Sequence, residues 1–158
     1  MTNIYAMLDN IDKKILHYVQ LNNQLTSTEL SDRVGLSPTS VQRRLHRLRA
    51  DKVIERDIAV VSPAALGRPL TMLVSVELER ERSDIIDRFK QAVRNRPEVQ
   101  SAYYVTGDTD FVLIVTAKDM ADYEAFTRDF FYNNMDIKGF KTTVVMDRIK
   151  ASFTMPTD

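Results

Sequence analysis

Cysteine is absent from the 158-residue chain. Without thiols, the sequence excludes a disulfide framework, a thiolate metal site and a cysteine nucleophile. This is compatible with a reducing cytoplasm, where we expect the protein to act. Glycine and proline are scarce, with four and five residues, so a long disordered segment is not expected.

Long apolar runs and an excess of one charge are also missing. No stretch approaches the roughly 18 apolar residues of a membrane span, and the opening MTNIYAMLDNIDKK lacks a signal-peptide pattern. The formal net charge is zero, which argues against a generally basic protein that binds polyanions indiscriminately. Basic residues are instead concentrated within 37–52, which holds one acid (Asp51) and five bases: Arg43, Arg44, Arg47, Arg49 and Lys52.

This basic cluster lies in the second of two adjoining segments that both begin like helices. Thr26 and Glu29 fit a capping box at the start of residues 26–34. Ser37, followed by proline, fits the start of a helix over 38–51. The pair is typical of a helix-turn-helix, whose second helix can present polar side chains to the DNA major groove.

Neighbouring segments complete a small N-terminal domain. Gly35 suits the tight turn between the two helices, and residues 9–22 predict a preceding helix with Asp9 as its cap. The apolar-polar-apolar pattern of residues 53–61 predicts a short β-ribbon, a wing with Arg56 at its tip. Arg56 either touches a phosphate there or is an ordinary soluble turn residue.

The basic helix also has an alternative interpretation that involves no DNA. Helical hairpins with a solvated basic face occur in many proteins. Arg44 in particular either faces DNA or points inward to a carboxylate such as Asp32. His46 fits an exposed polar residue better than a metal ligand.

Residues 62–69 (SPAALGRP) break the pattern and mark a linker between a DNA-binding domain over 1–61 and a second domain over 70–158. The second domain alternates strands and helices in the order β-α-β-β-α-β, which predicts a ferredoxin-like αβ sandwich. The expected elements are strands 70–79, 99–106 and 111–117, a last strand beginning at 140, and helices 83–96 and 119–134, capped by Ser83 and Asp119. The fold class is therefore α+β.

A ferredoxin-like sheet has both helices on one face. The strands here are apolar enough that the other face should not meet water, so a partner sheet is the simplest cover and we expect a homodimer. Phe131 lies off the core stripe of its helix. It is either an interface residue or additional core.

Four segments carry a family resemblance: LDNIDKKIL (8–16), LSPTSVQRRLHRLRADKVI (36–54), LG (66–67) and VTGDTDFVLIV (105–115). In this order and spacing they resemble the Lrp/AsnC (feast/famine) family of prokaryotic transcription regulators along nearly the whole chain. The resemblance implies a winged helix-turn-helix domain and a ligand-sensing αβ domain. It also implies dimers that assemble into tetramers or octamers and a small effector, most often an amino acid, bound between sensing domains.

The candidate DNA contacts follow by matching position. The resemblance implies contacts from the second helix: Thr39, Ser40, Gln42, Arg43 and Arg47. His46 lies on the same side of that helix, and Thr26, Ser37 and Arg56 complete the expected set. These side chains can reach base edges and phosphates of double-stranded DNA.

The expected effector site centres on the turn Gly107-Asp108-Thr109-Asp110, which matches the family's G-x-x-D turn. Gly107 lets the backbone approach a small ligand closely, and Asp108 or Asp110 can accept a hydrogen bond from an α-ammonium group. Asp136, Thr142 and Thr143 are further candidates. The alternative is an ordinary hairpin turn. Residues 133–140 lack the family's usual Pro-Gly pair, which leaves the effector open.

The sequence thus predicts a sequence-specific transcription regulator controlled by a small effector, with no cofactor. An enzyme resembling siroheme decarboxylase is one alternative. However, such chemistry favours a residue that titrates near neutral pH, and both histidines (His17 and His46) lie in the N-terminal domain. A DNA-compacting architectural protein is another alternative, and it would use the same residues.

Overall fold

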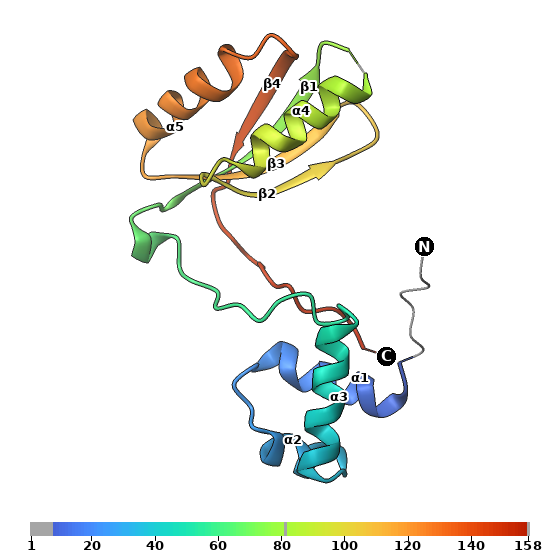
Figure 1. Cartoon of the computed structure of the whole chain (residues 1–158). Helices are drawn as coiled ribbons and strands as arrows, with labels where there is room; N and C mark the ends of the chain where they lie inside the picture. The colour runs from blue at the N-terminus through green and yellow to red at the C-terminus, as the bar shows by residue number, and fades with distance from the viewer. Residues whose placement is uncertain (1–7, 81, 158) are drawn as a thin grey trace. The chain divides into compact units, whose positions relative to one another are not determined.

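The computed structural model describes residues 8–80 and 82–157, so residues 1–7 and 158 of the two expected domains lie outside the described part. The chain forms two compact units (Figure 1). The helical unit comprises the described residues 8–59 and 150–157, and the sheet unit comprises the described residues between Val60 and Ile149. The expected linker at 62–69 stays a prediction. Within the described ranges, no helix is long and apolar enough to cross a bilayer.

The described residues of the helical unit form three helices, as predicted: α1 (Asn10–Leu21), α2 (Ser27–Val34) and α3 (Pro38–Ala50). Their apolar faces meet in one core, which consists of Ile15, Leu30, Val34, Val41, Leu45 and Leu48. Because α3 contributes to the core only at spacings of three and four, its remaining face is left to solvent.

The predicted caps fix the turn between α2 and α3. The Thr26 amide donates to Glu29 Oε2 at 2.8 Å, and the Glu29 amide donates to Thr26 Oγ1 at 3.2 Å, which confirms the capping box. Ser37 Oγ accepts from the Ser40 amide at 3.3 Å. Gly35 has φ +73°, a left-handed conformation that a side chain would strain.

The β-ribbon predicted over residues 53–61 is wrong, because those residues contain no strand. The central Glu55-Arg56-Asp57 lacks the glycine or asparagine that a tight hairpin turn requires, and a lone two-stranded ribbon is marginal in water. Asp57 is instead held by Arg49 of α3, with Nε 2.9 Å from Oδ2. The helix-turn-helix is therefore followed by an irregular segment over residues 53–61 and not by a wing.

The sheet unit has the predicted β-α-β-β-α-β order. Its strands are β1 (Leu70–Leu78), β2 (Val99–Tyr104), β3 (Phe111–Ala117) and β4 (Ile137–Val144), and its helices are η1 (Ala64–Leu66), α4 (Ser83–Arg94), α5 (Met120–Thr127) and the π-helix η2 (Arg128–Tyr132). All pairings are antiparallel, in the order β2-β3-β1-β4. This arrangement confirms the ferredoxin-like fold.

Both long helices cover the same face of the sheet (Figure 1). Alternate residues of β1 and β3 pack there against α4, α5 and η2. Val74 of β1, Leu113 of β3 and Phe89 of α4 belong to this core. Phe131 belongs to this core, with 2% of its surface exposed and its ring 4.4 Å from that of Phe140. The wider π-helical turn brings Phe131 inward beside Phe130, which an α-helical periodicity does not predict.

Several element boundaries differ from the prediction by one to three residues, and two helix and strand starts differ for a local reason. β4 begins at Ile137 instead of 140, because its pairing with β1 continues through a register shift in which Lys138 is the extra residue and Ile137 lies opposite Leu78. Ser83 is the first residue of α4 and not its cap. The cap position belongs to Arg82, whose side chain makes no capping hydrogen bond. Asp119 does cap α5, accepting from the Asp122 amide at 2.8 Å.

Candidate functional sites

The solvent face of α3 carries most of the predicted DNA contacts. Thr39, Gln42, Arg43 and His46 are exposed, opposite the buried core residues of the same helix. Across residues 8–80 and 82–157, no carboxylate forms an ion pair with Arg43. Its five N–H donors therefore remain available to an external acceptor.

Two of the other three arginines of α3 pair with carboxylates at the start of α1, whereas Arg49 pairs with Asp57. Arg44 Nη1 lies 2.7 Å from Asp9 Oδ2 and 2.8 Å from Asp12 Oδ1. Arg47 pairs with the second oxygen of Asp12 through Nη2. Asp12 has 1% of its side chain exposed, whereas half of the Arg47 side chain is exposed. Arg44 thus points inward as one alternative predicted, but to Asp9 and Asp12 and not to Asp32.

The acidic pair joins the start of α1 to the middle of α3. Asp9 and Asp12 also form the capping box of α1, in which the Asp12 amide donates to Asp9 Oδ1 at 2.7 Å. That backbone hydrogen bond, with the Arg44 guanidinium next in effect, lowers the pKa of Asp9, and both carboxylates raise the pKa of Arg44. The arrangement fixes how α3 is presented relative to α1.

The remaining predicted DNA contacts lie at helix starts or beyond α3. The Thr26 hydroxyl donates to Glu29 Oε2 at 2.8 Å, and the Ser37 hydroxyl donates to Ser40 Oγ at 2.9 Å. Ser40 is half-buried. Arg56 is exposed in the segment where the ribbon was expected. Thr26 and Ser37 therefore act first as caps.

A polar hollow of about 250 Å³ lies at the end of the sheet where the GDTD turn meets β1. It is lined by Glu77, Leu78, Glu79, Arg80, Gly107, Asp108, Thr109, Asp110 and Lys138. All four residues of the predicted turn contribute. The side chains supply four carboxylates and two cationic groups, a set that can pair with both charged ends of a zwitterion.

Within the turn, two side chains are already used to build it. Asp110 Oδ2 accepts from the Leu78 amide at 2.7 Å, and Thr109 Oγ1 donates to the Val76 carbonyl at 2.6 Å. Gly107 has φ +124°, a conformation that favours glycine. Asp108 is exposed, and none of the described residues forms an ion pair with it. Asp108 is therefore the turn's available carboxylate.

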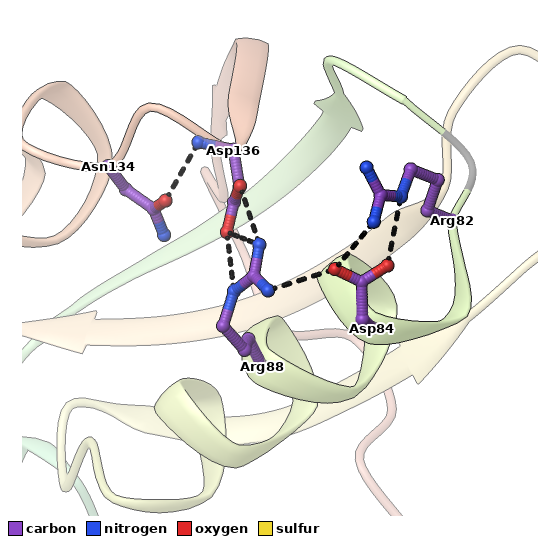
Figure 2. A network of polar contacts seen from close by, with 5 residues as sticks. All are labelled: Arg82, Asp84, Arg88, Asn134 and Asp136. Atoms are coloured by element: carbon purple, nitrogen blue, oxygen red, sulfur yellow. Dashed lines mark hydrogen bonds and ion pairs between the residues drawn. The ribbon is translucent and has the colours of Figure 1, made fainter.

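Asp136, predicted to bind the effector, is held by another partner. Figure 2 shows its carboxylate against the Arg88 guanidinium, whose Nη2 lies 2.9 Å from Oδ2. Arg88 also reaches Asp84 at 3.1 Å, and Asp84 pairs with Arg82 (Figure 2). The network links α4 to the start of β4. Asp136 does not line the hollow.

Thr142 and Thr143 do not line the hollow either. Thr142 lies opposite Val74 on the helix-covered face, where its Oγ1 is 2.6 Å from the Tyr123 hydroxyl. Burial raises the pKa of Tyr123. Thr143 lies opposite Leu73, so it belongs to the uncovered face. Adjacent strand residues point to opposite faces, so the two threonines cannot share one site.

The sequence did not point to the residues that line the hollow from the end of β1 and just beyond it, namely Glu77, Leu78, Glu79 and Arg80. Glu77 lies near the end of β1, and Glu79 follows its last residue. Lys138 enters because β4 starts early, and it pairs with Glu77, which raises the pKa of the lysine. Alternating acids at the end of a strand were the available signal.

Comparison with protein families gives two matches that together span most of the chain. Residues 8–49 match the AsnC-type helix-turn-helix domain, and residues 71–155 match the Lrp/AsnC ligand binding domain. A helix-turn-helix transcriptional regulator of Sinorhizobium fredii is 66% identical over 153 residues, covering 96% of this chain and 90% of that protein. The leucine-responsive regulatory protein of Escherichia coli K12 is 33% identical over 145 residues, covering 92% and 88%.

Solved structures show the same architecture. A transcriptional regulator from Neisseria meningitidis, in complex with L-methionine, is similar with a TM-score of 0.89 and 33% identity, covering 94% of this chain and 96% of that one. An AsnC family regulator from Agrobacterium tumefaciens gives 0.88 and 31%, with the same coverage. The relatives are transcription regulators and not enzymes.

Proposed function

The chain belongs to the Lrp/AsnC family of transcription regulators, and we propose from this premise that it binds specific operator sites through α3 under the control of an amino acid. The observation that carries the DNA half is the exposed polar face of a capped second helix, on which Arg43 is free of any carboxylate among the described residues. We place this activity in the cytoplasm.

Specific binding is tested by fluorescence anisotropy with the DNA upstream of the protein's own gene and with a shuffled duplex of equal length. At physiological salt, the upstream DNA is expected to bind at least about a thousandfold more tightly than the shuffled duplex. Equal affinities that fall together with rising salt would instead support a DNA-compacting protein.

The effector half of the proposal rests on the hollow beside the GDTD turn. Asp108 and Glu79 offer carboxylates to an α-ammonium group, and Lys138 offers a cation to an α-carboxylate. The hollow is small and mostly polar, which suits a ligand of amino-acid size. Asp136, Thr142 and Thr143 are not assigned to it.

A thermal-shift screen against the twenty L-amino acids tests this assignment. At a concentration 100 times its Kd, a true ligand is expected to stabilise the protein by about 2.7 kcal/mol. Asp108→Asn is expected to lower the affinity for that ligand roughly tenfold or more, because a charge-assisted hydrogen bond is lost. Asp87→Asn, an exposed change on α4, is the control. An Asp108→Asn protein with the parent's affinity would remove Asp108 from the site.

We also propose a homodimer formed through the uncovered face of the sheet, with tetramers or octamers built from dimers. Leu73 is 40% exposed at the centre of this face, paired with Ile114 of β3 and Thr143 of β4. Tyr103 adds an aromatic ring that is 55% exposed. A second sheet packed here would remove this apolar surface from water.

The dimer interface is tested by light scattering after size-exclusion chromatography. Leu73→Lys is expected to convert the parent oligomer to monomers at micromolar concentration, because a charge would be buried without a partner. Asp87→Lys places the same charge on the exposed side of α4 and should leave the mass unchanged. An unaltered mass for Leu73→Lys would move the interface elsewhere.

A further inference from the structure

The C-terminal residues do not stay with the sheet to which β4 belongs. After β4 ends at Val144, the chain leaves the sheet unit at Ile149, and residues from Lys150 cluster with the helical unit. The chain therefore passes between the two units twice, once at Ala59–Val60 and once at Ile149–Lys150. We call residues 150–157 the C-terminal strap.

One side chain of α1 holds this strap. The Gln20 amide binds both backbone groups of Met155: Oε1 accepts from the Met155 amide at 2.6 Å, and Nε2 donates to the Met155 carbonyl at 3.1 Å. The N–H and C=O of an extended residue point to the same side, so a single amide can pair with both, as a neighbouring strand would. Pro156 favours this geometry because it biases the preceding residue toward extended backbone.

The strap is shaped locally and held by polar contacts. Ser152 Oγ accepts from the Thr154 amide at 3.0 Å, which bends the chain just before Met155. The side chains of Phe153 and Met155 remain 64% and 69% exposed, so apolar burial contributes little to the docking. A contact made mainly of two neutral hydrogen bonds is specific in geometry and readily reversible.

The first connection is anchored at its other end. Arg68 donates from Nη2 to the Thr116 carbonyl at 2.6 Å and lies 3.3 Å from Asp122, which ties residues before β1 to the sheet unit. The second connection ends instead on the helical unit, at Gln20. Each connection thus has a side-chain anchor, one on each unit.

We propose that Gln20 is the docking site of the C-terminal strap and that this reversible contact is a second link through which the state of the sheet unit reaches the DNA-binding helices. The partner that this surface of α1 takes is an extended segment of the same chain. Docking itself stands on the contacts above, whereas its effect on operator binding rests on the proposed function.

Docking is tested by spin labelling, for which the cysteine-free chain is suited. A nitroxide on Thr154→Cys is expected to give a slow component in the parent. Gln20→Ala should shift the equilibrium between docked and free strap roughly tenfold toward the free state, because both hydrogen bonds are lost. The free state is expected to give a fast, sharp spectrum. Gln20→Glu should also free the strap, since a carboxylate cannot donate to the Met155 carbonyl and repels it. Gln24→Ala and Gln24→Glu are the matched controls.

A parent protein whose spectrum shows only fast motion would contradict the docking site. A slow component that persists in folded Gln20→Ala and Gln20→Glu proteins would also contradict it. Circular dichroism identifies folded variants, and Gln20→Glu keeps the shape of the side chain. Operator affinity is measured on the same proteins, where freeing the strap is expected to weaken binding about threefold through lost preorganisation. A freed strap with unchanged operator affinity overturns the link. A parent that binds no DNA contradicts the proposed function alone, since the spectra still decide docking.

Discussion

Replacing Arg43 with alanine is expected to weaken operator binding by roughly 5- to 150-fold, which corresponds to about 1–3 kcal/mol for a bidentate contact to a guanine edge. Arg43 is exposed on α3, and no ion pair within the described chain competes for its guanidinium. The change should leave the free energy of unfolding within about 0.5 kcal/mol of the parent's value, because it affects no core residue. Fluorescence anisotropy at fixed salt provides the measurement.

Two further variants locate the source of this loss. Arg43→Lys keeps the charge but lacks the planar fork, so it should recover phosphate attraction and not base discrimination. Arg49→Ala removes a cation from the same helix that already pairs with Asp57, and it should have the smaller effect. If Arg43→Ala bound the operator as tightly as the parent while folded, α3 would not be the reading helix in the sense proposed.

Replacing Asp12 with alanine is expected to destabilise the helical unit by about 3 kcal/mol, near the lower end of the cost of breaking a buried ion pair. The lower end applies because half of the Arg47 side chain is exposed and retains water. The change strips Arg44 and Arg47 of a shared carboxylate and removes half of the α1 capping box. For a unit of this size, the expected fall in melting temperature is about 12 °C or more.

Asp32→Ala is the matched control, since Asp32 is an exposed carboxylate of α2 and none of the described residues forms an ion pair with it. It should change the free energy of unfolding by no more than about 0.5 kcal/mol. Asp12→Asn retains the volume of the side chain but not its charge, and its stability should lie between those of Asp12→Ala and Asp32→Ala. Thermal melting provides the measurement. Equal melting temperatures for Asp12→Ala and Asp32→Ala would show that the Asp9, Asp12, Arg44 and Arg47 side chains do not hold α3 in place.

Features that depend on neighbouring residues were predictable from the sequence. The capping box of Thr26 and Glu29 and the left-handed Gly35 each arise within three or four positions, and the structure confirms them. The strand and helix order of the second unit followed from periodicity. The ribbon at 53–61 failed because a strand exists only with a partner, and the apolar pattern alone does not supply one.

Features that depend on distant residues were not predictable. Arg44 meets Asp9 and Asp12 from 35 and 32 positions away, and Arg88 meets Asp136 across 48. The predicted effector set was divided for the same reason. The turn at 107–110 lies in one hollow with Glu77 and Lys138, whereas Thr142 and Thr143 share a strand but face opposite sides. Phe131 reached the core through a π-helical turn that has no clear sequence signal.

The central claim is that α3 reads defined DNA sites and that an amino acid, bound in the sheet unit, alters the reading. DNase footprinting on the protein's own upstream DNA, at about 150 mM salt, tests it most directly when repeated with each L-amino acid that raises the melting temperature. The expected result is a bounded protected segment whose half-saturation concentration changes at least about fivefold with one amino acid. Protection without boundaries, or a bounded footprint that no stabilising amino acid shifts, would contradict the account.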